Sequence, residues 1–97
     1  MYVILTSKPG QFRTELAEGM QLVEVYDYVF CGRKRAQFVI AELTGQAKVR
    51  IVDEASPAAV NVVPCKFLPT FASVEKARAE LRQLVRFGEL DASLVRR

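Results

Sequence analysis

Apolar residues recur in short runs over the first two thirds of the chain, in patterns that predict β-strands. The first run covers residues 2–6 and is rich in β-branched and aromatic side chains, which favour extended backbone. A longer run over 21–31 is apolar on both faces, which is typical of a strand in the middle of a sheet. Further strands are predicted over 36–43, 47–52 and 60–63. Because short turns join the second, third and fourth of these strands, we expect those three to form an antiparallel meander.

Glycine and proline mark the breaks between these runs. Lys8-Pro9-Gly10-Gln11 places Pro and Gly in the order that a type II turn prefers, and Gly19 interrupts the chain again. The stretch 12–17 between them is open to two interpretations. Phe12 and Leu16 stand four residues apart and could form one helical turn, but a short second strand fits the same residues.

The last quarter of the chain contains the one segment with helical periodicity. Ser73 is placed to cap its N-terminus, with Glu75 in the first turn, where the helix dipole favours a carboxylate. We expect Gly88 just beyond its C-terminus, Asp91 as the cap of a short terminal turn, and a frayed tail at Arg96-Arg97. The apolar positions at helical spacing are Val74, Ala77, Leu81, Leu84 and Val85.

Two short stretches carry a resemblance to SH3 domains. Val25-Tyr26-Asp27-Tyr28 resembles the ALYDY stretch that opens those domains, and Val63-Pro64-Cys65-Lys66-Phe67-Leu68 is similar to the motif that closes them. The chain has no Trp, which forms the main wall of the groove that receives polyproline ligands in that family. Arg33-Lys34-Arg35 stands where the family has an acidic loop. The resemblance therefore implies a small barrel topology, and it does not imply ligand-binding residues in this chain.

These elements predict a single α+β domain over residues 1–97. The expected architecture is an antiparallel β-sheet or small SH3-like barrel of about five strands, with one C-terminal amphipathic helix across a face or an open end. A composition that is 51% apolar allows an ordered core without disulfides or metal. No apolar stretch reaches the roughly 18 residues of a membrane span, so none is expected. Because the N-terminal residues lack a basic leader and a cleavage site, we expect a cytoplasmic location, in which cysteines stay reduced.

The residue types present argue against catalysis. The chain has no histidine, which removes the commonest general base near neutral pH and the commonest transition-metal ligand. We therefore expect a non-catalytic protein without a metal or cofactor. Asp27, between two tyrosines, could do acid–base work if it were partly buried, but the favoured interpretation is that it pairs with a base or accepts backbone N–H bonds near the strand end. Cys31 precedes three cations, which makes it a candidate redox thiol, although a small apolar residue in a strand is the commoner role.

Three groups of basic residues indicate a binding role. Arg33, Lys34 and Arg35 fall in the predicted turn of a hairpin, where each arginine could hold a carboxylate or a phosphate through two hydrogen bonds. Lys48 and Arg50 fall on the outward positions of their strand. The third group recurs every four residues along the helix and consists of Arg78, Arg82 and Arg86.

The charge balance favours an acidic partner. A net charge of +3 and a pI near 9.1 would assist the approach to an acidic surface. We therefore predict a small accessory protein that docks on an acidic macromolecule, with a protein as the favoured partner and nucleic acid as the alternative. The plainer interpretation of residues 33–35 is a solvated turn whose charges discourage aggregation. An uncovered strand edge could also pair with a second copy and give a homo-oligomer.

Overall fold

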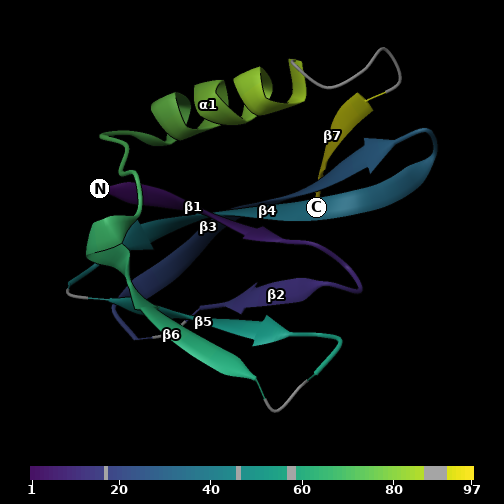
Figure 1. The fold of residues 1–97 in the computed structure, drawn as a ribbon. Helices are drawn as coiled ribbons and strands as arrows, with labels where there is room; N and C mark the ends of the chain where they lie inside the picture. Colours follow the sequence, from purple (N-terminus) through teal and green to yellow (C-terminus); the bar gives the residue numbers. More distant parts are fainter. Residues whose placement is uncertain (17, 46, 57–58, 87–91) are drawn as a thin grey trace.

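In the part of the chain that the structure describes, two antiparallel β-sheets and one α-helix make up the fold (Figure 1). The computed structural model describes residues 1–16, 18–45, 47–56, 59–86 and 92–97. The elements along the chain are β1 (Tyr2–Ser7), β2 (Phe12–Glu15), β3 (Met20–Phe30), β4 (Arg33–Leu43), β5 (Lys48–Asp53), β6 (Val60–Pro64), the 3-10 turn η1 (Cys65–Phe67), α1 (Val74–Arg86) and β7 (Ala92–Arg96). This arrangement confirms the predicted α+β class, whereas the closed SH3-like barrel is not shown.

The larger sheet has the strand order β1-β4-β3-β7. Its middle is the β3–β4 hairpin, in which Tyr26 lies opposite Phe38. The other edge of β4 pairs with β1, with Ile4 opposite Ile40. The prediction that the long strand is central in its sheet is therefore confirmed.

The smaller sheet has the strand order β2-β5-β6, which corrects the predicted meander. Ile51 of β5 lies opposite Thr14 on one side and Asn61 on the other. The β3–β4 part of the meander is confirmed, but β5 does not continue it because β1 already occupies the edge of β4 that β5 would need. Pairing between consecutive strands is a tendency that a better-matched partner can override.

The turn between β1 and β2 has the predicted geometry. The amide of Gln11 donates to the carbonyl of Lys8 at 3.0 Å, and Gly10 has a φ of 80°, as position i+2 of a type II turn requires. The chain therefore reverses and continues as a strand, so the strand interpretation of residues 12–17 is confirmed for Phe12–Glu15. The Thr14 amide donates to Ser7 Oγ at 2.8 Å, which ties the start of the smaller sheet to the larger one.

Apolar side chains fill both faces of the larger sheet. One cluster lies between the two sheets, and the other lies beneath α1, which crosses the opposite face (Figure 1). The cluster between the sheets contains Val3, Leu5, Ala41, Ala47, Val49 and Cys65. The cluster beneath the helix contains Ala36, Phe38, Ile40, Ala77 and Leu81.

Helix α1 begins as the sequence predicts. Ser73 Oγ accepts a hydrogen bond from the amide of Lys76 at 3.2 Å, which satisfies one of the free donors of the first turn. Ala77 and Leu81 are buried, but Leu84 is 48% exposed, so the predicted apolar stripe is wrong at this residue. The side chain of Val85, with Gly88 and Asp91, lies outside the described residues. No helix in the described ranges combines the length and apolarity needed to cross a bilayer.

The C-terminal residues form a strand, which corrects two predictions. Instead of a short terminal turn and a frayed tail, β7 (Ala92–Arg96) pairs antiparallel with β3, with Arg96 opposite Tyr26. The amide of Arg97 donates to the carbonyl of Val25 at 2.9 Å. A strand forms here because β3 has an open edge, and paired backbone groups are more stable than fraying ones.

Candidate functional site

The turn of the β3–β4 hairpin is shorter than the sequence analysis predicts. It consists of Cys31 and Gly32, between the paired residues Phe30 and Arg33. Both have positive φ, 52° for Cys31 and 74° for Gly32, which is the signature of a two-residue type I′ turn. The predicted location of Arg33, Lys34 and Arg35 in the turn is therefore wrong, because all three belong to strand β4.

Lys34 and the C-terminal Arg97 meet at one carboxylate. Lys34 Nζ lies 3.2 Å from Asp27 Oδ1, and Arg97 Nε lies 3.6 Å from Asp27 Oδ2. The carboxylate is mostly buried, whereas the two cations are 39% and 55% exposed. The interpretation in which Asp27 pairs with a base is confirmed, and it pairs with two.

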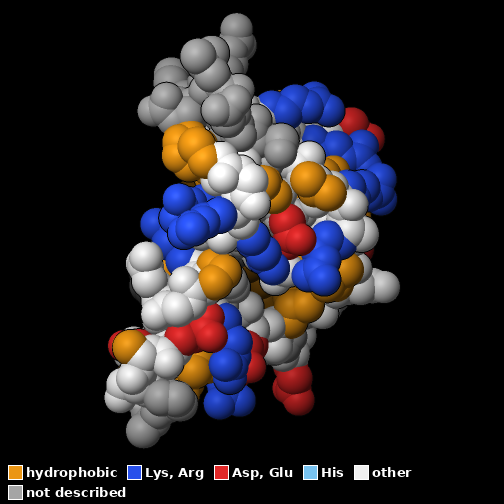
Figure 2. Space-filling model, turned by 90° about the vertical axis from the view of Figure 1, so that its right-hand side faces the viewer, with side chains coloured by type: hydrophobic (Ala, Val, Ile, Leu, Met, Phe, Trp, Pro, Cys, Tyr) orange, Lys and Arg blue, Asp and Glu red, His pale blue; other side chains and the backbone are white. Residues whose placement is uncertain are grey.

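Arg33 and Arg35 complete this basic surface on the same strand. The guanidinium carbon of Arg35 lies 6.0 Å from the centroid of the Phe30 ring, close enough for a cation–π contact. Arg33 is exposed beside the turn, opposite Phe30. Figure 2, which looks onto the side where the hairpin ends, shows Lys and Arg side chains gathered around an acidic one. We call the following residues the hairpin-end cluster: Arg33, Lys34, Arg35, Arg96 and Arg97.

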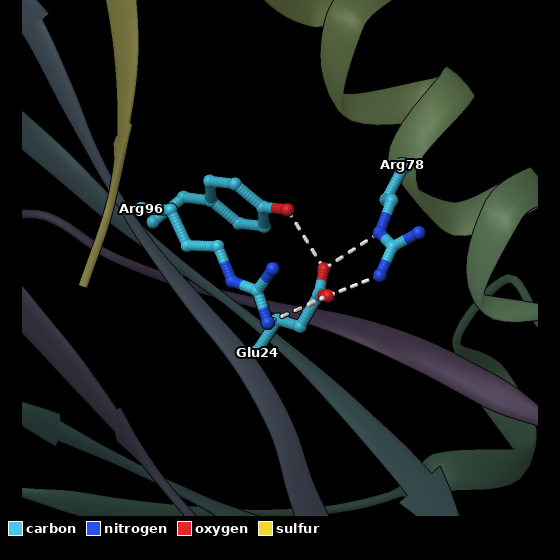
Figure 3. A network of polar contacts seen from close by, with 4 residues as sticks. Glu24, Arg78 and Arg96 are labelled. Carbon is cyan, nitrogen blue, oxygen red and sulfur yellow. Dashed lines mark hydrogen bonds and ion pairs between the residues drawn. The ribbon is translucent and has the colours of Figure 1, made fainter.

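Glu24 anchors the cluster to the rest of the fold (Figure 3). This residue of β3 is only 4% exposed. Its Oε1 accepts hydrogen bonds from Arg78 Nε at 2.8 Å and from the Tyr26 hydroxyl at 2.7 Å. Its Oε2 contacts Arg78 Nη2, and the guanidinium of Arg96 lies 3.1 Å away. One carboxylate therefore joins β3 to both α1 and β7.

These contacts shift the titration of the groups involved. The hydrogen bonds from Arg78 hold the pKa of Glu24 at about 2, against an ordinary value of 4.5, and the tyrosine bond and the charge of Arg96 act in the same direction. Burial, with the hydrogen bond to Glu24, raises the pKa of Tyr26. The bond to Glu24 also raises the pKa of Arg78. Glu24 is therefore ionised in the folded protein over the whole physiological range.

The structure places Lys48 and Arg50 on a different surface. They lie on β5 of the smaller sheet and line an open groove of about 820 Å³, together with Val62 and Pro64 of β6. Figure 1 shows the start of β5 on the side of the molecule away from the hairpin turn. The predicted basic groups therefore do not all converge, since 33–35 join the C-terminal arginines while Lys48 and Arg50 face the groove.

The two cysteines have different environments. Cys31 is exposed at the hairpin turn and Cys65 is buried. The Cys65 Sγ lies 4.0 Å from Met20 Sδ, and burial raises the pKa of this thiol, as expected for an unreactive core residue. Within the described residues, no three acidic, His or Cys side chains are grouped to hold a metal ion.

The unusual backbone of Cys31 leads to a testable prediction. Asn tolerates positive φ better than other non-glycine residues, and Asn-Gly is the preferred pair in a type I′ turn. Replacing Cys31 with Asn should therefore raise the free energy of unfolding by about 0.5 kcal/mol, measured by urea denaturation. Cys31→Ala is the control because it removes the thiol without the conformational preference. Equal stability of the two variants would contradict this account of the turn.

Arg96 and Arg97 are parts of the site that the sequence pattern does not predict. The pattern predicts a frayed tail for both, as for most residues at the end of a chain. The available signal was the pair of carboxylates, Glu24 and Asp27, within a strand that is otherwise largely apolar. Buried carboxylates require cationic partners. Arg96 and Arg97 are among the few arginines to which the sequence pattern gives no other role, so they were available candidates.

The arrangement is suited to binding an anionic group. Arg78 and Arg96 share Glu24 on the face of the larger sheet that α1 covers, and Lys34 and Arg97 share Asp27 on the other face, so each carboxylate has two cations beside it. The chain matches no known protein family, no curated protein and no solved structure. The geometry and charge of the described residues are therefore the basis for a functional proposal.

Proposed function

We propose that this chain is a non-catalytic binding protein whose hairpin-end cluster docks on an acidic surface of a protein partner. The observation that supports this proposal is the sharing of Asp27 by Lys34 and Arg97. One negative charge cannot neutralise two cations, and both cations remain partly exposed. The N–H donors of Lys34 and Arg97 that do not bond to Asp27 are available to a carboxylate of the partner.

An exposed apolar side chain lies among these charges. Val95 is 49% exposed and lies opposite Asp27 in the β3–β7 ladder. Protein interfaces combine a desolvated apolar contact with a charged rim that steers and orients the partner. In this proposal Val95 provides the apolar contact, and Arg33, Lys34 and Arg35 provide the steering charges.

The mixture of charges favours a protein over nucleic acid as the partner. Surfaces that bind nucleic acid are usually uniformly positive, whereas here the partly exposed carboxylate of Asp27 lies between Lys34 and Arg97. A partner with isolated carboxylates can avoid this group, but a continuous phosphate backbone has more difficulty. We expect the protein to act in the cytoplasm, where the exposed Cys31 stays reduced.

A charge-reversal experiment tests the proposal. Poly-glutamate serves as an acidic polypeptide and duplex DNA as the competing probe, with binding measured by fluorescence anisotropy at two salt concentrations. Arg33→Glu with Arg35→Glu should weaken poly-glutamate binding by about tenfold or more, since each exposed ion pair contributes up to about 1 kcal/mol and the reversal adds repulsion.

A second double variant controls for net charge. Lys76→Glu with Arg82→Glu changes the total charge equally but at exposed positions of α1. It should weaken binding much less than the hairpin variant. Equal losses in both variants would contradict a defined site. Tighter binding to DNA, with a steep loss of affinity as salt rises, would favour the nucleic-acid alternative.

A further inference from the structure

Strand β6 is the edge of the smaller sheet, and its outer side has no described partner. Of the four edge strands, β1 is closed at its start by two hydrogen bonds of 2.8 Å between Tyr2 and Phe71. Strand β2 is tied to β1 through Thr14 and carries Arg13 and Glu15. The sheet order also leaves β7 at an edge, where it carries Arg96. Strand β6 has neither kind of protection among the described residues: it has no charged residue, and no hydrogen bond to another segment closes its outer side.

The hydrogen-bond register shows which groups of β6 are available. The amide of Asp53 donates to the carbonyl of Ala59, and the amide of Cys65 donates to the carbonyl of Ala47. In an antiparallel ladder, hydrogen-bonded and non-hydrogen-bonded pairs alternate. The odd-numbered residues of β6 therefore bond to β5. The amide and carbonyl groups of Val60 and Val62 point away from β5, toward the open edge.

The side chains on this edge are apolar and exposed. Val60 is 38% exposed and Val62 is 55% exposed. Both have β-branched side chains that suit a sheet. Pro64 ends the strand, and because it lacks an amide hydrogen it offers only an acceptor. The edge therefore offers the amide and carbonyl groups of Val60 and Val62 to a further strand, and the strand ends at Pro64.

The charges next to this edge indicate what would occupy it. Arg50 lies opposite Val62, and Lys48 lies opposite Pro64, so both cations project from the same face of the sheet as Val62. All four residues line the groove, and its charged lining also includes Lys66 and Glu18, so three described cations and one described carboxylate line it. The only acidic contact of Arg50 among the described residues is Glu15, at 4.0 Å, and no described residue forms an ion pair with Lys48.

We propose that β6 accepts an extended acidic segment of a protein as an additional strand of the smaller sheet. Main-chain hydrogen bonds to Val60 and Val62 would provide the binding energy, and carboxylates beside Val62 and Pro64 would interact with Arg50 and Lys48. Strand addition of this kind is an established mode of peptide recognition. A second copy of the chain fits less well, because its own β6 brings no negative charge to these cations. This surface does not depend on the hairpin-end cluster, and its failure would leave the first proposal standing.

The test uses a pair of peptides that differ only in methylated backbone nitrogens. The probe is a short, capped peptide of alternating Glu and Thr. In an antiparallel added strand, residues whose side chains share the face of Val62 also direct their amides at β6. Methylating the Glu nitrogens should therefore weaken binding about tenfold or more, because two hydrogen bonds are lost. Methylating the Thr nitrogens should have little effect.

The same peptides also detect a parallel added strand. If only the Thr-methylated peptide loses affinity, the added strand is parallel, and strand addition is still supported.

A protein variant gives an independent measurement. Val62→Pro removes the outward amide while the bonds between β6 and β5 remain, and proline is tolerated on the open side of an edge strand. It should weaken binding of the unmethylated peptide about tenfold, and Val62→Thr, which keeps the amide, should not. Circular dichroism checks that both variants fold. If Val62→Pro does not fold, the methylated peptides decide the question.

Hydrogen exchange locates the contact. Peptide binding should slow exchange of the Val60 and Val62 amides, whereas those of Asn61 and Val63 are already protected by β5 in the free protein. Absence of peptide binding, or an equal effect of the two methylated peptides, would overturn the proposal. Protection of Val60 and Val62 that rises with protein concentration in the absence of peptide would also overturn it, in favour of a second copy.

Discussion

Replacing Leu81 with alanine should lower the free energy of unfolding by about 3 kcal/mol. Leu81 is 1% exposed and packs with Phe38 and Ile40 beneath α1. The described part of the helix has only one other fully buried side chain, Ala77, which has little apolar surface to contribute. The substitution should therefore loosen the helix as well as destabilise the fold. Urea denaturation measures the loss in the free energy of unfolding.

Leu84 provides a matched control on the same helix. It is also a leucine, but it is 48% exposed, so Leu84→Ala should change stability by less than about 0.5 kcal/mol. Hydrogen exchange should show faster opening of α1 than of β3 and β4 in the Leu81 variant, since those strands have additional partners. Equal stability losses for the two leucines would contradict the packing described here.

Replacing Glu24 with glutamine should lower the free energy of unfolding by about 2 kcal/mol at neutral pH. The change removes the charge that holds Arg78 and Arg96 together and leaves two guanidinium groups close to each other. Glu54→Gln is the control, because Glu54 is exposed, and its stability should stay near that of the natural chain. Thermal and urea denaturation provide the comparison.

The same carboxylate should govern the acid stability of the protein. The pKa of Glu24 is about 2 in the folded state and 4.5 ordinarily. A carboxyl whose pKa is lowered by folding stabilises the folded state above its unfolded pKa, and this contribution is lost as the pH falls through the folded pKa. Stability should therefore decrease from about pH 4.5 toward pH 2, with a much shallower decrease in Glu24→Gln. Parallel pH profiles for the two proteins would contradict the assignment.

Local signals in the sequence predicted the local structure well. Gly10 and Ser73 act through their nearest neighbours, in a turn and a helix cap, so their roles could be identified without knowing the fold. The alternation around Val49 likewise reports one strand and its burial. Gly10 and Ser73 depend on contacts within a few positions along the chain.

The largest errors concern contacts between distant segments. The meander prediction failed because only the fold shows that β1 lies beside β4. Glu24 was missed because its partner Arg78 is 54 residues away, and nothing near Glu24 in the sequence indicates that pairing. The hairpin-end cluster was predicted only in part. Arg33, Lys34 and Arg35 are adjacent in sequence and were identified together, whereas Arg97 joins them only because β7 pairs with β3.

The pairing of β7 with β3 has a consequence for synthesis of the chain. Glu24 and Asp27 receive Arg96 and Arg97 as partners, and those residues leave the ribosome about 70 residues later, which takes seconds at about 5–20 residues per second. During that interval one edge of β3 is unpaired in the nascent chain, and its two carboxylates lack these arginines as partners. The pairing of β7 with β3 therefore forms later than the β3–β4 hairpin, and a chain that lacked residues 92–97 would leave this edge of β3 open to other strands.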